Sequence, residues 1–515
     1  MPQEPPEPDR RSEDAGGKPG RRPAAAGVTF AAAAGLGAWL GGRPGAALAH
    51  TSDNAIVLTL PSDLYIAGGS LVVGLSFLLV ALVGTARFAR LEAAVRPLGR
   101  LPLRGATAPS LFSFLVMLAL IGAGFLGTPD PLANPLPLTI WTLWWVGLTL
   151  LHLIFGNLWA ALNPWHGLYA LLGRLPGPAR WVATPPCRYP AWLGTWPAVL
   201  QFLGFAWFEL VYTAPQDPEI LARAVGLYFL ANLAAMLVFG GPAWLRQGEA
   251  FSVYFRIVSW MSPLNGRPAN EGPGKERPEP VAESAEAGRL HLTLPGLGLL
   301  RVAPLSLSGV AFVILMLSTV SFDGLSLTFR WLGAIGINPL EFPGRSAVLL
   351  PNTLGLLATF AALLACYLAV VWLGHRLAGR PTSLAAAFGG YALSVVPIAF
   401  GYHFAHYLTI FMVDLQYAAI AFNDPFGCGW NLLGLEGARV TASFLMDYHS
   451  VRLIWQSQIA IIVLAHVVAV ALAHAIALRQ SATLGGAVVS QIPMTALMIC
   501  YTLFGLWLLS APVAG

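Results

Sequence analysis

Charged residues are scarce in this sequence of 515 residues. Asp, Glu, Lys and Arg make up 10% of the chain, whereas hydrophobic residues make up 56%. A soluble domain carries about 25% charged residues, so this composition excludes an ordinary soluble protein. The formal net charge of +5 does not indicate nucleic-acid binding, because most basic residues lie in segments between apolar runs, where they orient a membrane protein. We therefore expect the lipid bilayer as a partner and no nucleic acid.

Cysteines and several motifs of known chemistry are also few or absent. The four cysteines are scattered and form no CxxC pair, so no disulfide framework is predicted. Residues 241–305 contain no Walker or GxGxxG motif, and the sequence contains no GxSxG nucleophile motif and no CPC metal-transport motif. Nucleotide binding and a serine nucleophile on a sharp turn therefore have no support. The cysteines are Cys187, Cys366, Cys428 and Cys500.

The N-terminal 49 residues read as two segments that precede the folded part. Residues 1–24 are rich in Pro, Gly and charge, which is typical of a disordered tail. Residues 25–49 are predicted to be a signal peptide or an uncleaved signal anchor, because an apolar run from Ala24 to Leu40 is followed by Ala47-Leu48-Ala49, the pattern of a cleavage site. Cleavage would leave His50 as the N-terminal residue, where its amine and imidazole could bind copper.

Ten apolar segments follow, each near the about 20 residues that a membrane-spanning helix needs. We predict an all-α fold, a polytopic transmembrane bundle of about ten spanning helices after the signal peptide. A first transmembrane half over 50–240 and a second over 306–515 would be joined by a cytoplasmic interfacial segment and linker over 241–305. The segments are 64–84, 110–128, 138–159, 191–213, 220–240, 306–324, 350–373, 384–408, 452–476 and 487–510.

The distribution of basic residues predicts the orientation of these helices. With residue 50 outside, 18 of the 29 Lys and Arg fall in the five inner loops, and five fall in outer segments. This is the positive-inside bias of multi-pass membrane proteins. We therefore predict a bacterial inner-membrane protein whose mature N- and C-termini both lie on the periplasmic side.

Tyr402–Tyr407 is the segment with the clearest chemical pattern. It holds His403 and His406, which share one face of a helix, at the expected outer end of segment 384–408. Pro397 lies just before them and would kink the helix. Loop residues Asp424–Gly434, rich in glycine, could cover this end of the bundle.

Three further ionisable residues are expected at the same outer level: His449, Glu209 and Asp323. Imidazole suits Zn and Cu, and three protein ligands with an open position are typical of catalytic zinc. We predict a periplasm-facing metal or cofactor site with His403, His406 and His449 as ligands. Glu209 or Asp323 would be a fourth ligand, a general base or a hydrogen-bonding neighbour. Alternatively, these histidines and tyrosines are interfacial anchors.

Deeper polar residues suggest a route through the bundle. His152 and His466 are expected in mid-membrane, and with Asp447 at the outer end they could form an ion or proton path. The competing interpretation is that buried polar residues hydrogen-bond between helices. His152 and His466 are also the pair that haem b would need on two helices, an interpretation we rank below the other two.

Six motifs together resemble a family of polytopic bacterial membrane proteins labelled fenitrothion hydrolase-like. The resemblance covers nearly all of the chain after residue 50. It implies hydrolysis of an organophosphate ester, a chemistry that commonly uses a metal to activate water. The motifs are Leu60–Tyr65, Asn157–Trp165, Ser318–Gly324, Tyr402–Tyr407, Asp424–Gly434 and His466–His474.

Three functions remain open at this point. The first is a transporter or metal-handling membrane protein, with a metal ion or small molecule as its substrate, and this is the one that we favour. The second is a membrane-embedded, metal-dependent hydrolase, and the third is an assembly or structural subunit without a site. The sequence assigns no catalytic residue and names no protein partner.

Overall fold

The computed structural model describes residues 62–84, 96–100, 107–265 and 289–514. The tail, the signal segment and His50 lie outside these residues. All described residues belong to one compact unit, Gly45–Gly515. The elements in chain order are α2 (Ser62–Val80), β1 (Arg96–Arg100), α4 (Thr107–Leu126), α5 (Pro135–Leu138), η1 (Thr139–Leu148), α6 (Thr149–Phe155), α7 (Trp159–Leu162), α8 (Pro164–Leu172), α9 (Pro178–Ala183), η2 (Ala191–Leu193), α10 (Trp196–Leu210), α11 (Pro218–Phe239), α12 (Gly241–Gln247), α13 (Ala250–Ser259), β2 (Leu264–Asn265), β3 (Arg289–Leu292), η3 (Leu297–Arg301), α14 (Leu307–Ser326), α15 (Phe329–Ala334), η4 (Pro339–Glu341), η5 (Arg345–Val348), α16 (Leu349–Leu377), α17 (Leu384–Asn423), η6 (Ser443–Leu445), α18 (Tyr448–Gln480) and α19 (Leu484–Ser510).

The prediction of an all-α bundle is confirmed, and the described residues fit a multi-pass membrane protein. Nine of their helices are long and apolar enough to cross a membrane. The remaining predicted span, 191–213, instead forms η2 and the 15-residue α10. At about 1.5 Å per residue, α10 is shorter than a hydrocarbon core of about 30 Å. The nine are Ser62–Val80, Thr107–Leu126, Pro135–Phe155, Pro218–Phe239, Leu307–Ser326, Arg345–Leu377, Leu384–Asn423, Tyr448–Gln480 and Leu484–Ser510.

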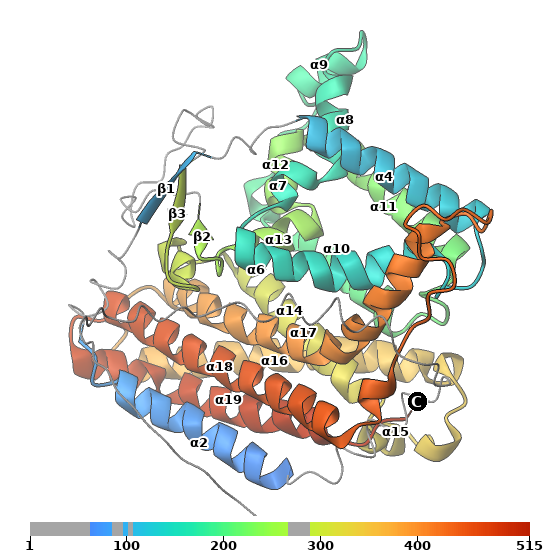
Figure 1. Ribbon diagram of the computed structural model, residues 1–515. Helices are drawn as coiled ribbons and strands as arrows, with labels where there is room; N and C mark the ends of the chain where they lie inside the picture. The colour runs from blue at the N-terminus through green and yellow to red at the C-terminus, as the bar shows by residue number, and fades with distance from the viewer. Residues whose placement is uncertain (1–61, 85–95, 101–106, 266–288, 515) are drawn as a thin grey trace, which may run out of the picture. The chain divides into compact units, whose positions relative to one another are not determined.

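The helices of the second half pack side by side, and α2 joins them. In Figure 1, α14 and α16 to α19 lie together with α2 along α18 and α19, and contacts between these elements are extensive. α14 is the central helix, because most of its side chains are buried. Helix α2 therefore packs with the second half, although in sequence it begins the first.

The remaining elements of the first half form a second group around α10 and α13. In Figure 1, α4, α7, α8, α10, α11, α12 and α13 lie above α14 and α17. Helix α13 belongs to the segment predicted to be interfacial, a prediction that stays open, and most of this helix is buried within the protein, including Phe251, Tyr254 and Phe255. The reason is that its aromatic side chains pack against Trp144, Trp145 and Phe202.

Helix α17 is far longer than predicted. It runs for 40 residues from Leu384 to Asn423, with Pro397 inside it, whereas the predicted segment ended at residue 408. At about 1.5 Å per residue it is about 60 Å long, twice the thickness of the hydrocarbon core. His403 and His406 therefore lie in the middle of a helix, and the prediction that they end it is wrong.

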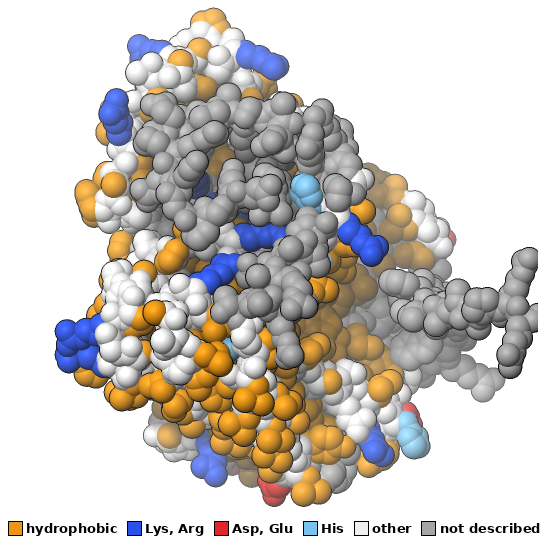
Figure 2. All heavy atoms as spheres, turned by 90° about the vertical axis from the view of Figure 1, so that its left-hand side faces the viewer, with side chains coloured by type: hydrophobic (Ala, Val, Ile, Leu, Met, Phe, Trp, Pro, Cys, Tyr) orange, Lys and Arg blue, Asp and Glu red, His pale blue; other side chains and the backbone are white. Residues whose placement is uncertain are grey.

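A small sheet joins two loops that were predicted on the same side of the membrane. Strand β3 pairs antiparallel with both β1 and β2, in the order β1-β3-β2. Figure 2 views the molecule from the left-hand side of Figure 1, where β1 and β3 lie, and Lys and Arg side chains are spread over this face.

Candidate functional site

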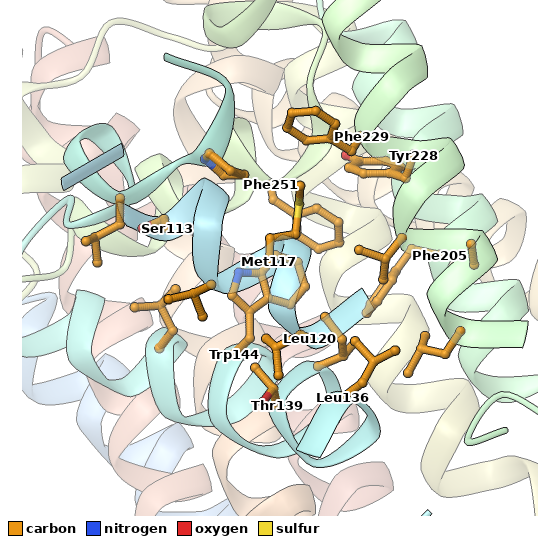
Figure 3. Close-up of a pocket in the computed structure, with 18 of the residues that line it drawn as sticks. Ser113, Met117, Leu120, Leu136, Thr139, Trp144, Phe205, Tyr228, Phe229 and Phe251 are labelled. Carbon is orange, nitrogen blue, oxygen red and sulfur yellow. The ribbon is translucent and has the colours of Figure 1, made fainter. Parts of the chain in front are cut away.

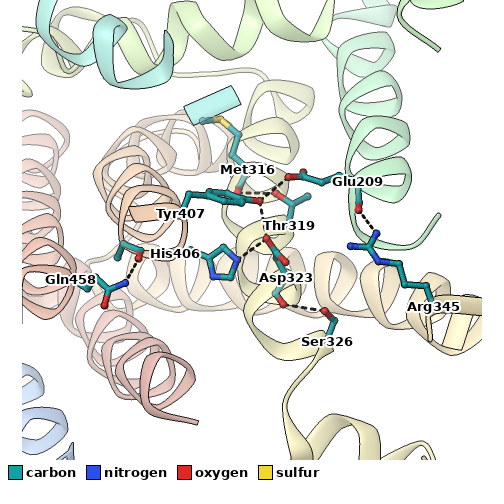
Figure 4. Close-up of polar contacts among 10 residues, drawn as sticks. Glu209, Met316, Thr319, Asp323, Ser326, Arg345, His406, Tyr407 and Gln458 are labelled. Carbon is teal, nitrogen blue, oxygen red and sulfur yellow. Dashed lines mark hydrogen bonds and ion pairs between the residues drawn. The ribbon is translucent and has the colours of Figure 1, made fainter. Parts of the chain in front are cut away.

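Four polar side chains from three helices form a connected network inside the bundle, which we call the polar network (Figure 4). The Tyr407 hydroxyl oxygen lies 2.9 Å from Oε1 of Glu209 and 2.8 Å from Oδ2 of Asp323. Nε2 of His406 lies 2.8 Å from the same Asp323 oxygen. Sequence analysis named Glu209, Asp323 and His406 as site residues, and the structure brings these three together.

Two of the four side chains lie at helix ends, and the other two lie in the middle of α17. Glu209 is the residue before the last in α10, and Asp323 lies in the last turn of α14. Tyr407 and His406 come from the middle of α17, which passes both ends. Arg345, just before α16, donates from Nη1 to the backbone oxygens of Glu209 and Tyr212, at 2.7 and 3.2 Å, and so ties the end of α10 to the loop before α16.

The single hydroxyl hydrogen of Tyr407 limits which carboxyl group in the network can be ionised. A tyrosine hydroxyl carries one hydrogen, and an ionised carboxylate can only accept. Tyr407 therefore cannot donate to Glu209 and Asp323 at once. For both short contacts to be hydrogen bonds, one carboxyl must be protonated and donate to the tyrosine oxygen. Asp323 already accepts from Nε2 of His406, so the arrangement with most hydrogen bonds has the proton on Glu209.

The network is partly accessible. The side chain of His406 is 31% exposed and that of Asp323 is 19% exposed, and Glu209 and Tyr407 are half-buried. Ionisable groups inside membrane helices are costly and usually face a bundle interior or an aqueous cavity. Four such groups in one connected set make the polar network the candidate functional site.

His403, one turn before Tyr407, has a different environment. It is buried, and Nε2 lies 3.2 Å from the backbone oxygen of Trp145. Its ring meets the Trp145 ring edge to face at 4.7 Å, and Nδ1 has no hydrogen-bond partner among the described residues. His403 therefore packs against η1 and takes no part in the hydrogen bonds of the polar network.

His449 and Asp447 lie at the exposed start of α18. His449 is exposed, and the Asp447 carboxylate accepts from the Ser450 backbone N–H and hydroxyl, both at 2.9 Å. These hydrogen bonds hold the pKa of Asp447 below its usual value. Asp447 is thus an N-cap of α18, a role that sequence analysis did not assign to it.

His152 and His466 occupy separate buried positions. His152 bridges two elements: Nδ1 lies 2.7 Å from the Leu148 oxygen, and Nε2 accepts from the Trp159 N–H at 2.9 Å. His466 has Nδ1 2.9 Å from the Ile462 oxygen, and its Nε2 has no partner among the described residues. The predicted path through both residues and Asp447 stays a prediction.

The loop Asp424–Gly434 is ordered by its own first residues. Asp424 accepts from the backbone N–H groups of Cys428 and Gly429, at 2.9 and 2.8 Å. The loop contacts the end of α4, because a Cβ at Gly127 would lie 3.3 Å from the Pro425 oxygen. Gly427, Gly429 and Gly434 adopt positive φ values, which favour glycine.

Sequence reasoning missed two features of this region. The first is Tyr407, which lies in the chosen motif yet was not named as a site residue, because a tyrosine beside histidines reads as an interfacial anchor. The second is η1, a π-helix of ten residues. π-Helical turns are rare overall, but those that occur are often found at functional sites. No sequence pattern predicts one.

The described residues contain no group of three or more His, Cys, Asp or Glu side chains that could hold a metal ion. The chain matches no protein-family model, and no significant match is found among curated proteins or solved structures. The Zn or Cu site, haem b and the resemblance to fenitrothion hydrolase-like proteins therefore stay predictions.

Proposed function

We propose that this protein is a membrane transporter that couples solute movement to proton binding at Glu209, Tyr407, Asp323 and His406. The observation that carries the proposal is the tyrosine hydroxyl shared by two carboxyl groups, at 2.9 and 2.8 Å. This contact needs a titratable proton, and it joins α10, α14 and α17.

The chemistry of the network is a proton shift between two helices. The Glu209 carboxyl gives its proton to the Tyr407 oxygen while Tyr407 gives its own to Asp323, so that one proton moves from α10 to α14. Only O–H bonds break and form. Protonation of Asp323 then weakens its charged contact with His406, because a neutral carboxyl is a poorer acceptor. Proton binding would in this way alter how α14 holds α17.

The test is a pH-jump measurement on protein reconstituted in liposomes and adsorbed on a solid-supported membrane. A jump to acidic buffer should give a transient charge movement as protons bind. Glu209→Gln and Asp323→Asn should each reduce this signal to the level of protein-free liposomes, since each removes a carboxyl of the network. Candidate solutes are then screened for a sustained current, which proton binding without transport cannot give.

The matched control is Glu436→Gln, because Glu436 is an exposed carboxyl outside the network. It should keep the wild-type signal. Equal charge movement in the wild type, Glu209→Gln and Asp323→Asn would overturn the proposal. Metal handling, ester hydrolysis and an assembly role remain predictions from sequence that no described contact favours over proton coupling.

A further inference from the structure

A large apolar cavity lies among the helices of the first half, in the region shown in Figure 3. It has a volume of about 580 Å³. It opens to the surface along α4, where the lining residues Phe112 and Val116 are exposed, and its volume is in the range of about 300–1,000 Å³ that is usual for small-molecule sites. We call it the aromatic cavity. The elements that line it are α4, α5, η1, α7, α8, α10, α11 and α13.

The lining of the cavity selects against charge. Many lining side chains are aromatic, among them Trp144, Phe205 and Phe251, and none is Asp, Glu, Lys, Arg or His. A charged ligand would lose its hydration without a partner, and no basic side chain is present to hold a phosphate headgroup. Aromatic rings offer stacked and edge-to-face contacts to another ring. The lining therefore fits an uncharged, ring-containing molecule better than a phospholipid.

A few polar atoms among the lining residues lack partners. Trp159 is 7% exposed, and its Nε1–H has no hydrogen-bond partner among the described residues. Oε1 of Gln201 and the hydroxyl of Thr139 are likewise buried without a partner. Buried polar atoms are nearly always paired. Each of these atoms exposes almost no surface, so a ligand in the cavity reaches one of them only after its side chain turns.

The cavity is distinct from the polar network but lies close to it. The π-helix η1 places Trp144 in the cavity lining, while its neighbour Trp145 packs edge to face with His403 and, at 6.4 Å, with Tyr407. Phe205 lines the cavity and packs edge to face with both tryptophans.

We propose that the aromatic cavity binds one uncharged small molecule with an apolar, ring-containing body. Binding does not depend on whether the polar network carries protons, so this proposal can hold if the proposed function fails. Ligand binding would bring an apolar molecule against η1, beside the residues that exchange the proton.

The sequence offers positions at which the cavity can be filled. Gly204 on α10 lines the cavity, and a Cβ built there meets no atom within 4 Å. Ala224 on α11 is a second lining position. Gly226, also on α11, is a matched control, because its Cβ would likewise meet no atom within 4 Å and it does not line the cavity. Replacing a mid-helix glycine does not weaken the helix itself.

The experiment measures energy transfer from the tryptophans of the protein, four of which line the cavity, to N-phenyl-1-naphthylamine, with the full chain in nanodiscs of defined lipid. This probe is neutral, and 8-anilinonaphthalene-1-sulfonate has the same ring body with a negative charge. The neutral probe should bind the wild type saturably at one site and at least about tenfold more tightly than the sulfonate. Gly204→Phe and Ala224→Phe should weaken binding of the neutral probe by at least about tenfold, while Gly226→Phe leaves it unchanged.

Three results would overturn the proposal. The first is equal affinity for the sulfonate and the neutral probe in the wild type, a comparison that needs no variant. The second is unchanged binding in folded Gly204→Phe and Ala224→Phe. The third is a phospholipid that native mass spectrometry finds on the wild type and on Gly226→Phe but not on the filled variants. A wild type that gives no pH-jump signal but binds the neutral probe saturably would contradict only the proposed function.

Discussion

Tyr407 is the residue that connects the polar network, since its hydroxyl oxygen contacts both the Glu209 carboxyl group and the Asp323 carboxyl group. Tyr407→Phe keeps the ring and removes both hydrogen bonds. We expect it to lower the free energy of unfolding in detergent by about 1–2 kcal/mol and to abolish the pH-jump charge movement. The measurement is reversible unfolding together with the current recorded from the same preparation.

The control is Tyr417→Phe on the same helix, because none of the described hydrogen bonds involves the Tyr417 hydroxyl. It should change neither stability nor current. A double-mutant cycle of Tyr407→Phe with Asp323→Asn should be non-additive by about 0.5 kcal/mol or more. Additive effects would mean that the two residues do not share a hydrogen bond in the membrane.

Asp447 provides a prediction about pH. Its pKa is lowered by the hydrogen bonds from Ser450, so its contribution to α18 is complete above the unfolded-state pKa of about 3.9. The contribution is lost only as the pH falls through the still lower folded pKa. Hydrogen exchange at the start of α18 should therefore be slowed by the same factor in the wild type relative to Asp447→Asn at every pH from neutral down to about 3.9. Asparagine is a fair comparison because it also caps helices without a charge.

A change in that factor near neutral pH, measured in a His449→Gln background so that the neighbouring imidazole contributes no charge, would contradict the capping role. It would mean that Asp447 gains or loses protons there, as a residue of a proton path would do.

Part of the site was accessible to sequence reasoning. Ionisable residues in apolar segments are few, and expected depth alone selected Glu209, Asp323 and His406, which the structure brings together. The same reasoning grouped His403 and His449 with them, because depth specifies a level in the membrane and not an angle around the helix. The direction of each side chain depends on helix packing, and Tyr407 becomes a site residue only through that packing.

At the scale of elements, close approach of helix backbones holds the second half together. Small residues at helix interfaces permit such approach. Gly389 of α17 is an example, because a Cβ there would collide with the backbone of Leu305, in the segment before α14. Backbone atoms cannot rotate away as a flexible side chain does.

We therefore expect Gly389→Ala to lower the free energy of unfolding in detergent by about 1–3 kcal/mol, the usual cost of overpacking. Gly226→Ala on α11 is the comparison, since its Cβ would meet no atom within 4 Å. It should be neutral or stabilise the protein by about 0.5–1 kcal/mol. Equal melting temperatures for the two variants would show that α17 and Leu305 do not approach closely.

Helices were predicted well where the apolar run itself defines them, as in α4, α11 and α19. Their ends were poorly predicted where polar residues continue a helix beyond the apolar run. Helix α17 carries His403, His406 and Asp414 without a break, because helical hydrogen bonds persist through polar residues. The burial of α13 depends on aromatic partners far apart in the sequence, which hydropathy does not reveal.

At the scale of the whole described chain, contacts between loops agree with the predicted sidedness. Each of seven contacts joins two loops or span ends that sequence analysis expected on the same side. At the end expected inside, the pairs are His474 with Val83, Arg479 with Leu300 and Gln480 with Ala386, and a Cβ on Gly374 would meet the backbone of Ser490. At the other end they are Arg345 with Tyr212, Trp141 with Pro215 and Phe329 with Pro512.

Two native cysteines can establish which end faces the periplasm. Cys428 and Cys187 are both exposed, the first in the loop after α17 and the second between α9 and η2. The positive-inside bias places Cys428 outside and Cys187 inside. A membrane-impermeant maleimide added to intact spheroplasts should therefore label a variant that keeps only Cys428 and spare one that keeps only Cys187. Inside-out vesicles should reverse the result. Labelling of Cys187 in intact spheroplasts would invert the topology and place the polar network at the cytoplasmic end, so that it would meet protons from the cell interior first.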